Sequence, residues 1–130
     1  MKAILDALKT RLAATASLTS IVSTRIYLDQ GPADAELPLL VYRPTTVATE
    51  ETMGGVTLYR VTFQFQVFYS NSGTTGIHTA SDAIQTALSS PLSPTGFDRA
   101  VFVRQSRGAP VFADDSWSIT EEYRCTAFEA

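Results

Sequence analysis

The longest regular pattern in the chain is an alternation of apolar and polar positions over residues 58–69. Odd-numbered positions from 59 to 69 are all aromatic or valine, and the even-numbered positions 60–66 hold arginine, threonine and glutamine. Side chains alternate between two faces only in a strand, so this pattern predicts a strand with one face toward a core. At about 3.3 Å per residue the strand would reach about 40 Å, far beyond the usual length. We therefore expect it to cross the whole domain and to project at one end.

The polar face of this strand has an unusual composition. Thr62, Gln64 and Gln66 are uncharged, yet each can form hydrogen bonds. An ordinary solvent-facing strand carries more lysine and glutamate. This composition is typical of a face turned to another subunit or to a narrow channel, and plain exposure to solvent remains the alternative.

Two segments have apolar residues at helical spacing, over 2–16 and about 76–90. The apolar stripes are Ile4, Leu5, Leu8 and Leu12 in the first segment, and Ile77, Ala80, Ala83, Ile84, Ala87 and Leu88 in the second. Pro91 cannot continue a helix and should end the second one. Between the two, Thr19 or Ser20 can cap one further short turn.

Shorter apolar runs predict further strands over 25–28, 39–43, 99–107 and 116–128. On the last strand, Trp117, Ile119, Tyr123 and Cys125 share one face. Hairpin-like links join the strands in pairs, so the strands should pair antiparallel. The expected fold class is α+β: an antiparallel β-sheet of four or more strands with two main α-helices packed on one face, in a single domain 1–130.

The segment between the strands at 39–43 and 58–69 is the candidate partner-binding site. Its residues are Glu50, Glu51, Thr52, Met53, Gly54, Gly55 and Val56. A Gly-Gly pair tolerates positive φ, which favours a hairpin turn. Because the flanking strands are long, the tip should project, and methionine adapts well at contact surfaces. A mobile loop with no role is the alternative interpretation.

Composition narrows the class of protein further. The chain has 130 residues, 45% of them hydrophobic and 18% charged, which favours one packed domain over a disordered chain. Its net charge of −3 does not match the basic footprint of a groove-binding nucleic-acid protein. Apolar runs are too short for a membrane helix, and Asp6 lies where a signal peptide needs apolar residues, so we expect an intracellular protein.

Few side chains suggest chemistry. His78 should lie on the solvated face of the second helix, with Asp82 one turn on and available for an ion pair. The single cysteine, Cys125, has the spacing of a core residue rather than of a catalytic thiolate. Glu121 and Glu122 should point to opposite faces of their strand, so they cannot act as a carboxylate pair. We expect no catalytic site, no cofactor and no metal site; Asp114-Asp115 alone lacks the further oxygen ligands that a cation needs.

The chain has one candidate basic surface. Arg99, Arg104 and Arg107 could form a modest basic stripe on one strand, near Phe97 and Phe102. A groove for single-stranded nucleic acid would need more positive charge and exposed aromatic residues. A solvated or subunit-facing strand is therefore the preferred interpretation.

Four patterns, in order along nearly the whole chain, resemble the phage tail completion or tail terminator family. They are the N-terminal helix followed by residues 17–22 and 25–27, the proline-led strand entry at 37–42, the long strand at 58–67 followed by a Ser/Gly loop and the helix at 77–87, and the closing strand at 122–127. The order and spacing of these patterns carry the resemblance. The loop at 91–97 is longer than is usual in the family.

The resemblance implies an α+β fold and a structural virion protein rather than an enzyme. It implies a homo-oligomer, a hexameric ring that caps the tail tube at its head-proximal end and offers a docking surface to the head–tail connector or stopper protein. The implied partners are therefore the tail tube protein and the connector, with DNA passing through the bore without sequence-specific binding. No cofactor and no membrane are implied. The location would be the virion tail of a phage or prophage particle, after assembly in the bacterial host cytoplasm.

Two alternatives stay open. Another ring-forming virion component, such as a tail tube subunit or a head–tail stopper, would show similar patterns. A small α+β ligand-binding protein or enzyme would instead need a deep pocket and a pair of titratable groups with perturbed pKa values.

Overall fold

The computed structural model describes residues 2–31, 36–46, 49–70, 75–113 and 115–129. The elements follow the order α1 (Lys2–Ala14), α2 (Ala16–Val22), β1 (Ile26–Leu28), β2 (Leu39–Pro44), β3 (Thr49–Met53), β4 (Val56–Ser70), α3 (Thr75–Ala87), β5 (Phe97–Arg107), β6 (Val111–Ala113) and β7 (Ser116–Glu129). In the described residues, seven strands form a sheet of order β1-β2-β4-β7-β5, with β3 paired to β4 and β6 paired to β7. The predicted α+β class is confirmed.

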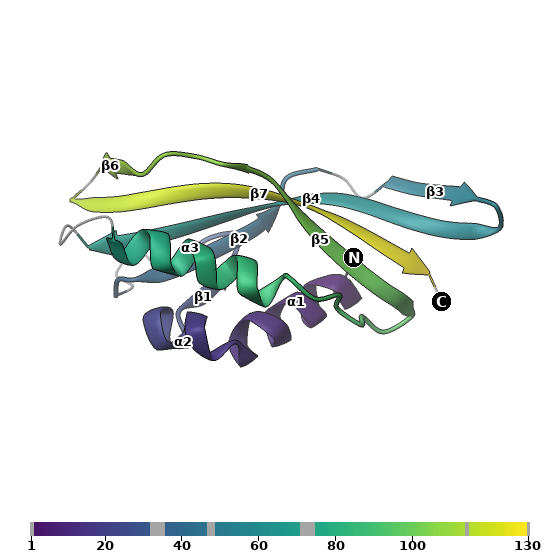
Figure 1. The fold of residues 1–130 in the computed structure, drawn as a ribbon, viewed down its shortest axis with the longest axis horizontal. Coiled ribbons are helices and arrows are strands. Elements are labelled where there is room, and N and C mark those ends of the chain that lie inside the picture. Colours follow the sequence, from purple (N-terminus) through teal and green to yellow (C-terminus); the bar gives the residue numbers. More distant parts are fainter. Residues whose placement is uncertain (1, 32–35, 47–48, 71–74, 114, 130) are drawn as a thin grey trace.

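The predicted long strand is β4, and it is a central strand of the sheet. It pairs antiparallel with β7 from Leu58↔Phe128 to Ser70↔Ser116. Its alternation places Phe63 and Phe65 in the core with no exposed surface. Two long antiparallel strands therefore run through the whole molecule, and the other elements attach to them (Figure 1).

The core lies between the sheet and the helices. In Figure 1 the three helices lie below the strands. The largest fully buried side chains come from α1, α2, α3 and from the sheet: Tyr42, Tyr123, Phe63, Phe65, Ile4, Leu8, Leu12, Leu18, Leu40, Ile77, Ile84 and Leu92. On α1 the buried stripe is Ile4, Leu8 and Leu12, whereas Leu5 lies at its margin. No helix in the described part of the chain is long and apolar enough to cross a membrane.

The N-terminal helical region is divided. Thr15 has extended backbone angles (φ −85°, ψ 105°), so α1 ends before it and α2 begins after it. Its hydroxyl donates to the Arg11 carbonyl at 2.8 Å, which offers the backbone an alternative to continuing the helix. The sequence predicted only a short turn here, and the structure has a two-turn helix that buries Leu18 and Val22.

Three features of the sheet differ from the prediction. The strand β1 runs parallel to β2, so the sheet is mixed rather than wholly antiparallel. The segment expected to be a loop before the long strand contains β3, which forms a tight hairpin with β4. A short strand, β6, extends the edge formed by β5 along β7.

Candidate interaction surfaces

The β3–β4 hairpin is the predicted partner-binding site. Gly54 and Gly55 form its turn with φ of 57° and 84°, and positive φ at both central residues is what a two-residue type I′ turn requires. The hairpin extends past the helices, at the right of Figure 1. A Cβ atom added to either glycine would meet nothing within 4 Å, so the tip has open space around it. The predicted Gly-Gly turn is confirmed.

The side chains of the hairpin are described in part. Glu50 and Thr52 are exposed. A hydrogen bond with Glu50, which lies opposite Tyr59 in the ladder, raises the pKa of the Tyr59 hydroxyl. The Tyr59 ring in turn packs edge-on against Phe97 on β5, with centroids 5.3 Å apart. The side chains of Glu51, Met53 and Val56 lie outside the described residues, and a partner-binding role for this hairpin stays a prediction.

The polar face of β4 lies on the side of the sheet away from the helices. Thr62, Gln64 and Gln66 are partly exposed and lie opposite Arg124, Glu122 and Thr120 of β7. Hydroxyl and amide groups, together with the charged groups of Glu122 and Arg124, thus lie on this side of the two central strands, which we call the helix-free face. Nearer β2 this face is more apolar, since Leu39 and Val41 are buried on it.

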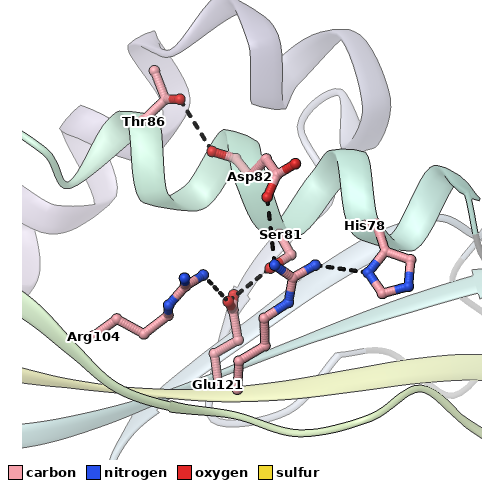
Figure 2. A network of polar contacts seen from close by, with 7 residues as sticks. His78, Ser81, Asp82, Thr86, Arg104 and Glu121 are labelled. Atoms are coloured by element: carbon pink, nitrogen blue, oxygen red, sulfur yellow. Dashed lines mark hydrogen bonds and ion pairs between the residues drawn. The ribbon is translucent and has the colours of Figure 1, made fainter.

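On the helix side, a buried polar cluster joins α3 to the sheet (Figure 2). Ser81, fully buried on α3, donates to Glu121 Oε1 of β7 at 2.7 Å. Arg104 of β5 reaches the same oxygen at 3.3 Å. The other carboxylate oxygen, Oε2, is buried with no hydrogen-bond partner among the described residues. Because Ser81 has no exposed surface, it is closed to a substrate, and the cluster is suited to holding the helix on the sheet.

A second contact clamps the exposed side of the same helix. Arg107 Nη2 lies 2.7 Å from His78 Nδ1, and Arg107 Nη1 lies 3.5 Å from Asp82 Oδ1. A guanidinium can only donate, so Nδ1 is the acceptor in this contact. The predicted His78–Asp82 pair is therefore replaced by an arginine that lies between the two. His78 is exposed, as the sequence predicted.

The basic stripe proposed for β5 does not exist as one surface. The ladder shifts register between Arg104 and Ser106, and this bulge places Arg104 and Arg107 on the helix side, opposite Tyr123 and Glu121. Arg99 lies opposite Phe128 and stacks over its ring, with the guanidinium carbon 4.7 Å from the centroid. Two of the three arginines are thus bound to acids, and the third lies on the other face.

The other residues considered for catalysis or metal binding lie where they serve the fold. Cys125 is fully buried, and burial raises the pKa of its thiol to about 12, so it stays protonated at neutral pH. Glu121 is buried while Glu122 lies on the helix-free face, which confirms that they point apart. Asp114 lies outside the described residues. Among those described, no group of three or more His, Cys, Asp or Glu side chains is placed to hold a metal ion.

An open hollow of about 800 Å³ lies between α1 and residues 92–95. Its charged residues are already engaged. Lys2 binds Asp6 at 3.0 Å, and the Arg11 guanidinium donates to the carbonyls of Ala87, Ser90 and Pro91 at the end of α3. The hollow offers few free polar groups to orient a ligand, so it gives the ligand-binding alternative little support.

Sequence reasoning missed two members of the buried cluster. Glu121 has the same parity as Ile119, Tyr123 and Cys125, so alternation alone places it on the core face. A carboxylate there requires a partner, and Ser81 on the buried side of α3 supplies one. An acidic residue at a core-facing position of the strand was the signal in the sequence that could have predicted this cluster.

Solved structures share this fold. A chain in the virion of a native gene transfer agent (GTA) particle matches with a TM-score of 0.74 and 19% identity, over 98% of this chain and 96% of that chain. A second solved chain matches with a TM-score of 0.68 and 12% identity, over 99% of this chain and 95% of its own length. At these identities the likeness establishes the fold alone.

The family comparison goes further. No protein of curated function matches the chain. The family described as tail completion protein gp17 matches residues 6–109, which include most of α1, all of α2 and α3, and strands β1 to β5. The chain therefore belongs to the tail completion protein gp17 family.

Proposed function

We propose that this chain is a structural protein of the virion tail that forms a hexameric ring at the head-proximal end of the tail tube. The ring ends tube growth and provides the surface on which the head–tail connector docks. Membership of the tail completion family over residues 6–109 is the observation that carries this proposal. The similar fold of a chain within a gene transfer agent virion supports a place in such a particle. No catalytic step is part of the proposal.

The β3–β4 hairpin, Glu50–Val56, is proposed as the contact with the tail tube or the connector. Its tip lies away from the core. The two-residue glycine turn already has a defined conformation, so docking should cost the tip little conformational entropy. Two acidic residues lie next to each other in β3, so a basic surface on the partner would fit. The hairpin would then reach along the tail axis, between stacked rings.

The proposed bore carries duplex DNA without reading its sequence. A bore that attracted phosphate strongly would slow passage, and the net charge of −3 agrees with weak attraction. Assembly in the host cytoplasm and incorporation into the virion tail belong to the same proposal.

Loss of the chain from a particle-producing cell is the test. Without a terminator, tail tubes should vary in length and remain without heads, and the wild-type chain supplied in trans should restore joined particles of uniform length. A tube subunit would give no tubes at all when it is removed. A head–tail stopper would leave tubes of normal length. Either result would reassign the chain within the tail.

A further inference from the structure

The two opposite edges of the sheet both carry exposed apolar residues. In the sheet order β1-β2-β4-β7-β5, the outer strands are β1 and β3 on one side and β5 with β6 on the other. The exposed large apolar side chains divide between these edges: Leu28 and Leu37 at the β1 edge, and Val103, Val111 and Phe112 at the β5–β6 edge. In Figure 1, β6 lies along the upper margin and β1 lies low, beside the helices.

The degree of exposure is high for such residues. Leu28 is 42% exposed, Phe112 is 48% exposed and Val111 is 58% exposed. Among the described residues, no further strand pairs with the outer side of β5, β6 or β1. An apolar edge with free backbone groups favours pairing with another chain, and soluble proteins usually protect such edges. Each edge is therefore suited to being covered.

The two edges are also complementary in charge. Of the described residues around the β1 edge, 25–31 and 36–38 contain two acidic residues and one arginine, a net charge of −1. Residues 97–113, which form the β5–β6 edge, contain three arginines and one aspartate, a net charge of +2. Arg104 and Arg107 are partly engaged by Glu121 and Asp82 but keep 28% and 27% of their side chains exposed, while Arg99 is exposed.

One occupant satisfies both edges at once. A second copy of the chain brings an acidic apolar β1 edge to the basic apolar β5–β6 edge of the first, and leaves its own β5–β6 edge for a third copy. Such a contact between different surfaces is heterologous, and it closes into a ring when the rotation between copies closes. A contact between two like edges would instead stop at a dimer and bring charges of the same sign together.

We propose that the β5–β6 edge of one copy binds the β1 edge of the next, head to tail, around the ring. This inference rests on the proposed ring, and it names the surfaces that form it. The sheets of neighbouring copies then lie edge to edge, and the apolar side chains at 28, 37, 103, 111 and 112 are buried between copies.

Pairs of engineered cysteines test this contact. Leu28→Cys or Leu37→Cys is combined in one chain with Val103→Cys, Val111→Cys or Phe112→Cys, and the purified protein is treated with a short bis-maleimide, alone and with tail tubes. The native thiol of Cys125 is buried with a raised pKa and does not compete. At least one of the six pairs should give a covalent ladder from dimer up to the full ring on a denaturing gel.

The controls separate the contact from the ring itself. Each single variant should give no ladder, because a heterologous contact does not bring a position against its own copy. The pair Lys9→Cys with Gln85→Cys, on exposed helix faces, should stay monomeric on the gel. Dimers from a single variant would show a symmetric contact and overturn the proposal. A ring by native mass without any ladder would overturn the proposed edges and leave the proposed function intact. Monomers by native mass, alone and with tubes, would contradict both.

A charge placed in the contact gives an independent measurement. Leu28→Lys, which would face the basic edge, and Val111→Glu, which would face the acidic edge, should each weaken association roughly ten- to a hundredfold, the amount expected when one buried aliphatic side chain is lost from an interface. Gln85→Lys on the exposed face of α3 should leave association unchanged. Thermal unfolding of each monomer shows that the variants fold, and unchanged association of both folded edge variants would contradict the proposal.

Discussion

At the scale of single residues, parity along β4 and β7 decides which side chains build the core and which lie on the helix-free face. Val61, Phe63 and Phe65 are buried, while Thr62 and Gln64 between them lie on the helix-free face. Alternation in the sequence predicted this division, because a strand sends successive side chains to opposite faces.

Phe63 is the sharpest test of that division. Phe63→Ala removes a fully buried ring that lies 5.6 Å from the Phe102 ring and 6.4 Å from the Phe65 ring. We expect the free energy of unfolding to fall by about 3–5 kcal/mol in urea denaturation. Gln64→Ala, the neighbouring position on the other face, should change it by less than about 0.5 kcal/mol. A loss below about 1 kcal/mol for Phe63→Ala would mean that the core face was wrongly assigned.

The buried cluster makes a second prediction. Glu121→Gln weakens the contacts with Ser81 and Arg104 and leaves the guanidinium short of its countercharge. The expected loss is about 1–3 kcal/mol, at the lower end for a buried pair because Arg104 reaches solvent. Glu122→Gln, on the helix-free face, is the matched control and should be nearly neutral. Equal effects of the two substitutions would show that the cluster does not hold α3 on the sheet.

The raised pKa of Cys125 predicts sensitivity to alkaline pH. The folded thiol has a pKa of about 12 against an ordinary value of 9.0, so the unfolded chain loses this proton first as the pH rises. Stability is fully present below about pH 9 and falls as the pH approaches about 12, with a slope of up to about 1.4 kcal/mol per pH unit. Burial also raises the pKa of Tyr123 to about 12, with a further contribution from the Glu121 carboxylate, and adds to this loss above about pH 10.

Cys125→Ala should make that slope shallower. Urea unfolding of wild type and variant between about pH 8 and about pH 11 measures it as a change in slope, which is independent of the cavity that the substitution leaves. Parallel curves for the two proteins would show that the thiol does not titrate with unfolding.

At the scale of elements, periodicity located both main helices and every long strand to within a few residues. It missed β3 and β6 because both are short, and because β3 contains two glutamates and threonines, which read as loop composition. It also took β1 and β2 for a hairpin. The direction of a three-residue strand depends on how the connecting segment crosses the sheet, and the composition of that segment does not specify it.

The β3–β4 hairpin can be shortened without disturbing its register. Deleting Thr52 and Met53 with their ladder partners Val56 and Thr57 leaves Glu51 opposite Leu58, still joined by Gly54-Gly55. Folding should be nearly unaffected, because the tip lies outside the core and loop shortening is thermodynamically mild. On the proposed role, the variant should form rings and fail to restore joined particles in complementation.

One result would contradict that prediction, and a control variant separates the effect of length from that of charge. Full infectivity from the folded, shortened variant would remove the hairpin from the list of contacts. Glu50→Gln is the control variant, because it keeps the length of the hairpin and changes only the charge beside Tyr59. It should reduce complementation less than the deletion does.

At the scale of the whole molecule, the resemblance read from the sequence is confirmed by the family match. The sequence alone did not predict which residues lie at the two opposite edges of the sheet. Leu28 and Phe112 are far apart in sequence, and only the sheet order places them at opposite edges of one sheet. The proposed repeating contact between copies requires that placement.

The most direct test of the tail-terminating role is electron microscopy of purified tail tubes after addition of the purified chain carrying a small electron-dense label. We predict a six-fold ring with label at one end of each tube, and none along its length. Label along the whole tube, or tubes that stay bare at both ends while the protein remains folded, would contradict the account.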